Sequence, residues 1–133
     1  MQGSFRRVAT GLCVALALAL RVAAADLSET DKQFLAGYEK IRAALVADDL
    51  GAAKAAAAEI GDKGASVARS ESIAAARKEF APLSEEAVKL AKGQSGYYVA
   101  YCPMVKKSWV QTSEKISNPY AGGEMLTCGV IKK

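Results

Sequence analysis

Hydrophobic positions between residues 30 and 47 recur every three or four residues, which places them on one face of a helix. The charged side chains of this segment fall elsewhere on the helical wheel, as in an amphipathic helix with one buried face. Thr30 and Gln33 have the spacing of a capping box and predict the start of the helix. The buried stripe is expected to consist of Phe34, Tyr38, Ile41 and Leu45.

An alanine-rich segment follows after a short acidic interruption. The run AAKAAAAE has high helix propensity, and Asp48 or Asp49 is well placed to cap a second helix over about residues 50–60. Gly61 and Gly64 are expected to end it. Small side chains let two helices approach closely, so the first two helices are predicted to form an antiparallel hairpin.

A third amphipathic helix is predicted over about residues 67–92, again from apolar positions three and four residues apart. Pro82 interrupts this pattern because proline lacks the amide hydrogen that an interior helical position donates. We therefore expect a kink or a break near Ala81, with Ser84 capping the second part.

The periodicity changes after residue 93. The segment GYYVAYC, residues 96–102, is rich in aromatic and β-branched residues and predicts a short strand. LTCGVI, residues 126–131, is the second predicted strand, and pairing the two would bring Cys102 near Cys128. The expected fold is mainly α: a small antiparallel bundle of three to four helices, followed by a loop-rich C-terminal segment with a short two-stranded β pairing.

Residues 1–25 have the features of a secretory signal peptide. Arg6 and Arg7 precede an uncharged apolar run that is too short to span a bilayer, and Ala23 and Ala25 give an A-x-A cleavage site. The prediction is a signal peptide over 1–25 and one helical domain over 26–133, in the periplasm or secreted, with no membrane attachment after cleavage. The formal net charge of +4 belongs mostly to the leader, so bulk charge gives no support for a nucleic-acid partner.

The residue types present do not favour catalysis. The chain contains no histidine, which excludes catalytic triads and cysteine–histidine pairs, as well as histidine-rich zinc sites. The adjacent acidic pairs lie at predicted helix starts, where they complement the helix dipole. Gly122-Gly123 lacks the spacing of a phosphate-binding loop. We therefore predict that the protein is not an enzyme.

Sulfur is concentrated near the C-terminus, where Cys102 lies two residues before Met104 and Met125 lies three residues before Cys128. Thiolates and thioethers are soft ligands that select Cu(I) or Ag(I) over hard cations. Pro103 stiffens the turn between the first two sulfurs. These four residues are a candidate metal site, and Trp109 is a candidate cap for it through a cation–π contact.

A disulfide between Cys102 and Cys128 explains the two cysteines equally well. It would suit an exported protein and would stabilise a loop-rich segment by about 3 kcal/mol in the loop-entropy picture. The two methionines would then be flexible core residues. The two states can also alternate, with oxidation blocking the metal site.

The string YCPM…W…I…NPY.G..MLTCG, together with an upstream FL..Y..I..ALVADDL, resembles a bacterial family defined as a domain of unknown function. That family occurs as small exported proteins and as a C-terminal appendage of periplasmic adaptor subunits of copper and silver efflux pumps. The resemblance implies a helical domain linked to heavy-metal handling, with an efflux adaptor or a metal chaperone as partner. It places the family's sulfur pattern on Cys102, Met104, Met125 and Cys128, and its structural signature on Trp109, Asn118, Pro119, Tyr120 and Gly122.

Overall fold

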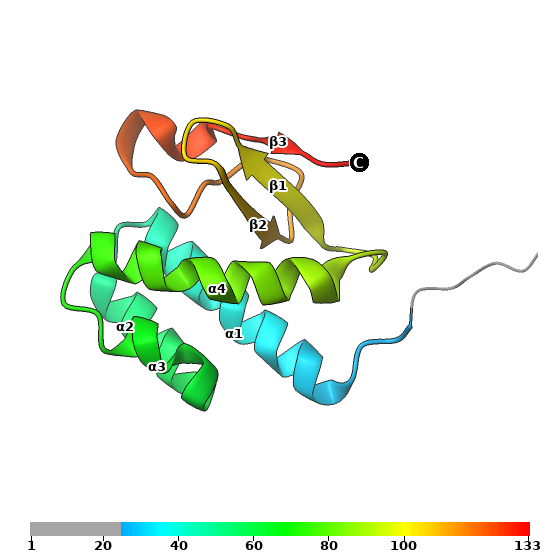
Figure 1. Ribbon diagram of the computed structural model, residues 1–133, viewed down its shortest axis with the longest axis horizontal. Coiled ribbons are helices and arrows are strands. Elements are labelled where there is room, and N and C mark those ends of the chain that lie inside the picture. Colours follow the sequence, from blue (N-terminus) through cyan, green and yellow to red (C-terminus); the bar gives the residue numbers. More distant parts are fainter. Residues whose placement is uncertain (1–24) are drawn as a thin grey trace, which may run out of the picture.

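The computed structural model describes residues 25–133, so the predicted signal peptide over 1–25 lies, except for its last residue, outside the described residues. The described chain is mainly helical with a small antiparallel sheet (Figure 1). Its elements are α1 (Glu29–Val46), α2 (Leu50–Glu59), the 3₁₀ turn η1 (Gly61–Gly64), α3 (Ala65–Ala68), α4 (Ile73–Ala91), β1 (Tyr98–Cys102), β2 (Lys107–Gln111), the 3₁₀ turn η2 (Gly123–Thr127) and β3 (Val130–Ile131).

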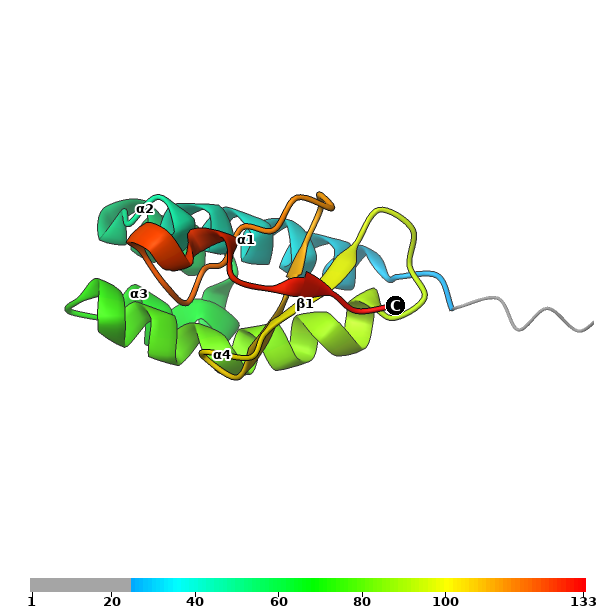
Figure 2. The same ribbon diagram turned by 90° about the horizontal axis from the view of Figure 1, so that it is seen from above.

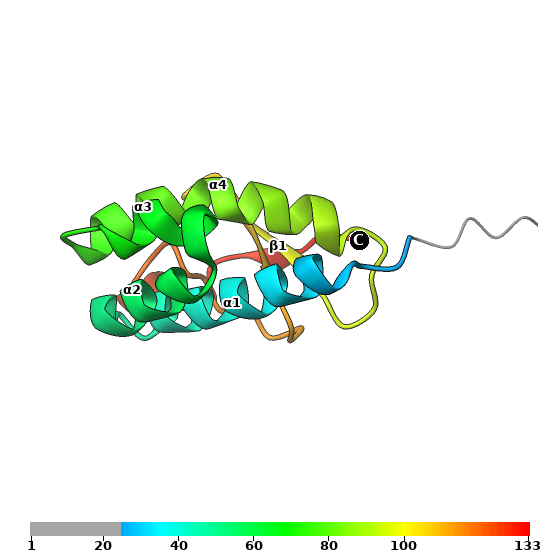
Figure 3. The same cartoon turned by 90° about the horizontal axis from the view of Figure 1, so that it is seen from below.

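The helices form one layer and the sheet forms another. α1 and α4 lie side by side, with α2 and α3 at one end of the pair (Figure 3). The strands lie over the seam between α1 and α4 (Figure 2). No helix within residues 25–133 is both long enough and apolar enough to cross a bilayer.

The amphipathic face of α1 is buried as its spacing predicts, since Phe34, Tyr38, Ile41 and Leu45 are all in the core. The predicted capping box at Thr30 and Gln33 is wrong by two residues. Ser28 is the N-cap, and its side chain accepts a hydrogen bond of 3.1 Å from the amide of Asp31. The earlier cap gives α1 a first turn that carries Glu29 and Asp31, which suits the helix dipole.

α2 begins where predicted, because the carboxylate of Asp49 accepts a 2.8 Å hydrogen bond from Ala52. The alanines of α2 allow close packing on α1, and Lys40 of α1 pairs with Glu59 of α2 at 2.6 Å. Gly64 is required for the turn that follows, since a β carbon there would collide with the backbone carbonyl of Ala57. The small residues of this segment thus allow close helix packing, as the alanine-rich sequence predicts.

The prediction of one helix over 67–92 is wrong in two respects, the position where the helix starts and the position where it is interrupted. The chain breaks at residues 69–72, between α3 and α4, and α4 begins after the N-cap Ser72. α4 then continues through Pro82 without an assigned interruption. Ser84 is not a cap but a buried residue inside α4. A proline in α4 is tolerated because the helix is held by its buried face, which packs against α1 and the sheet.

The sheet has three strands in the order β2-β1-β3, all antiparallel. The predicted pairing of the two segments is present, with Tyr101 opposite Val130. The predicted strand over 126–131 is wrong at its start, because Leu126 and Thr127 belong to η2 and β3 contains only Val130 and Ile131. The prediction of only two strands is wrong, because Lys107–Gln111 forms a third one that pairs with β1 along its whole length. β2 also contacts α4, so this unpredicted strand joins the sheet to the helices.

Candidate functional site

The two predicted cysteines meet directly. Cys102 ends β1 and Cys128 follows η2, and they form a disulfide with their Cα atoms 5.6 Å apart. The β1–β3 pairing produces this meeting, because Cys128 lies just before β3 and β3 runs beside β1. Cys102 is fully buried, whereas Cys128 is partly exposed. The bond therefore closes the C-terminal loop against the sheet.

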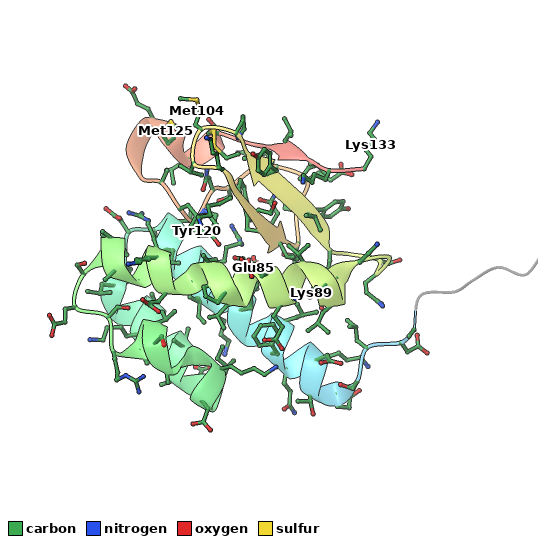
Figure 4. The ribbon with its side chains drawn as sticks, viewed as in Figure 1. Glu85, Lys89, Met104, Tyr120, Met125 and Lys133 are labelled. Carbon is green, nitrogen blue, oxygen red and sulfur yellow. A yellow bond between two sulfur atoms is a disulfide. The ribbon has the colours of Figure 1, made fainter. Side chains whose placement is uncertain are left out.

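The two methionines are placed differently. Met125 is partly buried and packs against the cluster that contains Cys102, Ala100 and Trp109. Met104 lies in the turn between β1 and β2 and is 73% exposed. Figure 4 shows both side chains at the same end of the sheet as the disulfide. Three of the four predicted sulfurs thus belong to one cluster, and the fourth extends into solvent beside it.

Trp109, predicted as a cap for the sulfur site, is a core residue of the sheet. It is fully buried, and its indole N–H donates a 2.8 Å hydrogen bond to Oε1 of Gln111. Its ring meets the ring of Tyr120 edge-on, with centroids 6.4 Å apart. Gly129 runs so close to Trp109 that a β carbon there would lie 2.8 Å from the indole ring. Trp109 therefore shares a cluster with Cys102 and also supports the loop around Cys128.

The predicted motif residues Asn118, Pro119, Tyr120 and Gly122 form the loop that carries Cys128. Asn118 is fully buried; its side chain donates to the carbonyl of Cys128 at 3.1 Å and accepts from the amide of Tyr120 at 2.8 Å. Arg77 of α4 donates to the carbonyl of Pro119 at 3.0 Å and lies beside Gly122. The buried side-chain amide of Asn118 thus fixes the loop at Tyr120 and at Cys128.

A buried hydroxyl network under this loop has no counterpart in the predicted site. Ser84 lies 2.7 Å from the hydroxyl of Tyr38 and 2.7 Å from that of Tyr120. The amide of Val110 donates to Tyr38 at 3.1 Å, so the network joins α1, α4, β2 and the loop. The one feature of the sequence that could have indicated this network is Ser84, which lies on the buried face of α4 four residues after Phe80.

Burial changes the ionisation of both tyrosines. Desolvation raises the pKa of Tyr120 to about 12, and its hydrogen bond to Ser84 opposes only part of that rise. Desolvation also raises the pKa of Tyr38, against the hydrogen bonds that it makes with Ser84 and Val110. Both phenols are therefore neutral in the folded protein at neutral pH.

We expect the protein to unfold at alkaline pH, because ionisation of Tyr120 is unfavourable in the folded state. The pKa of Tyr120 is higher in the folded state than the usual value of about 10, so the folded state holds this proton more tightly. The stabilisation is complete below pH ~10 and is lost as the pH rises towards about 12. We expect tyrosinate absorbance and loss of near-ultraviolet circular dichroism to change together in this range. Tyr120→Phe should move the transition to higher pH; an unchanged midpoint would contradict the assignment.

A groove lies between α4 and the β1–β2 hairpin, with a volume of about 460 Å³. Ser84 and Tyr120 line it, so two of the three hydroxyl residues of the network border this groove. Glu85 and Lys89 extend from α4 beside Tyr120 (Figure 4). The complete lining is Ala81, Ser84, Glu85, Val88, Lys89, Lys106, Lys107, Ser108 and Tyr120. This groove was not predicted, because its walls come from segments that are distant in the sequence.

Comparisons with protein-family models, with characterised proteins and with solved structures find no significant match. The resemblance to the domain-of-unknown-function family therefore stays a prediction. Within residues 25–133, no group of three or more His, Cys, Asp or Glu side chains is placed to hold a metal ion.

Proposed function

We propose that this protein is an exported binding domain that works with the Cys102–Cys128 bond closed. The bond supports the proposal because it joins the end of β1 to the loop that carries Asn118 and Tyr120. Disulfides persist mainly in oxidising compartments, which agrees with the predicted signal peptide. The working surface would then be one that the bond holds in place, and the groove beside α4 is such a surface.

Binding is favoured over catalysis by the side chains available. The chain has no histidine, and the groove offers lysines, hydroxyls and one carboxylate. The hydroxyl of Tyr120 is held neutral by burial, with its pKa raised to about 12, so it is a poor base at neutral pH. These groups are suited to hydrogen bonding and charge complementarity with a ligand.

Binding of Cu(I) or Ag(I) as cargo is the second candidate, and the position of Met125 favours it. Met125 packs against the cluster that holds both cysteines, so reduction of the bond would give two thiolates and a thioether in one place. Thiolates are required, because disulfide sulfurs are not metal ligands of this kind. Met104 would supply a fourth sulfur from the adjacent turn. On this alternative the partner would be a periplasmic efflux adaptor or a metal chaperone, as the family resemblance implies.

One experiment separates the two functions. Mass mapping of the protein purified from its export compartment should show a quantitative 102–128 bond that survives mild reductant. Free thiols or a copper adduct in the same material would contradict the proposal and favour metal binding. The reduced protein is then titrated with Cu(I) under competition. If metal binding is correct, Met125→Leu should weaken affinity about tenfold, while Met104→Leu should change it less. Equal affinity of the wild type and Cys128→Ser would exclude the sulfur site.

A further inference from the structure

The groove between α4 and the β1–β2 hairpin carries an excess of positive charge. Lys89 extends from α4, and Lys106 and Lys107 lie at the end of the hairpin turn, all of them exposed. Glu85 is the one carboxylate in the lining. Among the described residues, none of these four side chains takes part in an ion pair. Three lysines from two elements therefore line one concavity together with a single carboxylate.

The hydroxyl network borders the groove through Ser84 and Tyr120. Three hydroxyls carry three protons, but only two contacts join them, and the amide of Val110 already donates to Tyr38. Tyr120 donates to Ser84. If Ser84 donates in turn to Tyr38, the proton of Tyr38 is left in the core without an acceptor.

The other arrangement leaves the unpaired proton on Ser84, which is equally buried. Tyr38 donates to Ser84, and the proton of Ser84 is then the free one. Ser84 makes no bond to a backbone carbonyl among the described residues, unlike Ser70, which donates to the carbonyl of Ser66. Ser84 also lines the groove. Because Ser84 is only 1% exposed, the network supports the wall of the groove and does not offer a free donor to a ligand.

The backbone at Lys106 is strained in a way that points to the same site. Its φ is 53°, in the left-handed region that glycine and asparagine occupy most easily. The turn over residues 103–106 has this conformation at its last position, just before β2. A lysine there costs stability that a glycine would not, and such strain is often found at binding sites.

We propose that this groove binds a small oxyanion ligand, such as a carboxylate or phosphate compound, through Lys89, Lys106 and Lys107. Its volume of about 460 Å³ is in the range of small-molecule sites, which favours a compact ligand over an extended polypeptide. This inference deepens the binding role proposed above and rests on it. The three lysines supply the positive charge that an oxyanion requires.

The test is a titration of the full oxidised protein, labelled with ¹⁵N, with inorganic phosphate in one arm and succinate in the other. Sodium chloride at matched ionic strength is the control for screening. We expect saturable shifts of the amides of Ser108 and Tyr120 in the millimolar range. The arm with the tighter binding names the class of oxyanion. No saturable shift in either arm, or shifts spread evenly over the protein, would overturn the proposal.

Two variants separate binding from folding. Lys89→Gln should weaken binding about fivefold, whereas Lys78→Gln, an exposed lysine of α4 outside the groove, should leave it unchanged. Lys106→Gly should weaken binding by a similar factor while raising the unfolding temperature, because it removes strain. Equal effects of Lys89→Gln and Lys78→Gln on anion affinity would show that the anion does not bind in the groove. If the folded, fully oxidised protein binds neither anion, the proposed oxyanion site is wrong. The proposal of a binding domain held by the disulfide would not be affected by that result.

Discussion

Replacing Cys128 with serine is expected to lower the free energy of unfolding by about 3 kcal/mol. The bond closes a loop between residues 26 positions apart, and this loop has little regular structure other than η2 and the strand β2. Without the bond, the unfolded chain gains the entropy of an open loop, while the folded loop keeps its other contacts. Cys128 is the better choice for substitution, because Cys102 is fully buried and a serine there would add an unpaired hydroxyl.

Urea denaturation with and without reductant measures this effect. Reductant should shift the midpoint of the wild type to that of Cys128→Ser and leave the variant unchanged. An identical midpoint for the wild type under both conditions would show that the bond contributes nothing to stability. The slope of the transition should rise in the reduced protein, since a chain without the cross-link exposes more surface on unfolding.

Replacing Asn118 with alanine is expected to cost about 3 kcal/mol. Its amide group satisfies the carbonyl of Cys128 and the amide of Tyr120, and Asn118 itself is fully buried. Alanine would leave both groups without their partner in the interior, and each such group costs about 1–3 kcal/mol. The loss should be larger than that of an ordinary surface substitution by several fold.

The neighbouring Ser117→Ala is the matched control, because the side chain of Ser117 makes no hydrogen bond among the described residues. Its stability should stay within about 0.5 kcal/mol of the wild type. Thermal or urea unfolding of both variants decides the point. A cost for Asn118→Ala as small as that for Ser117→Ala would mean that the loop is held by the disulfide and by Arg77 instead.

Much of the helical layer follows from local patterns. The stripe from Phe34 to Leu45 predicts the buried face of α1, because helical spacing alone brings these residues together. The start of α2 follows from Asp49, whose side chain caps its own helix. The boundary between α3 and α4 does not follow, since apolar spacing continues across residues 69–72 and Pro82 suggests a break that the packed helix does not have.

The sheet and the groove depend on contacts between distant residues. β2 was missed because KSWVQ is short and begins with a polar pair, and its strand character comes from pairing with β1. Ser84 was interpreted as a cap, but its partners are Tyr38 and Tyr120, 46 and 36 residues away. Local sequence carries no information about which of these groups will meet.

The cysteines and methionines show which features follow from the sequence and which depend on the tertiary structure. By itself, the sequence predicted that the segments around Cys102 and Cys128 come together, because aromatic and β-branched residues mark the first segment and β-branched residues mark the second. It left open whether the cysteines bond directly or share an ion, since both need the same proximity. Only the tertiary structure decided that the cysteines bond directly, that Met125 packs partly buried beside them and that Met104 is exposed. These outcomes depend on how the hairpin turn and the Asn118 loop pack around Trp109.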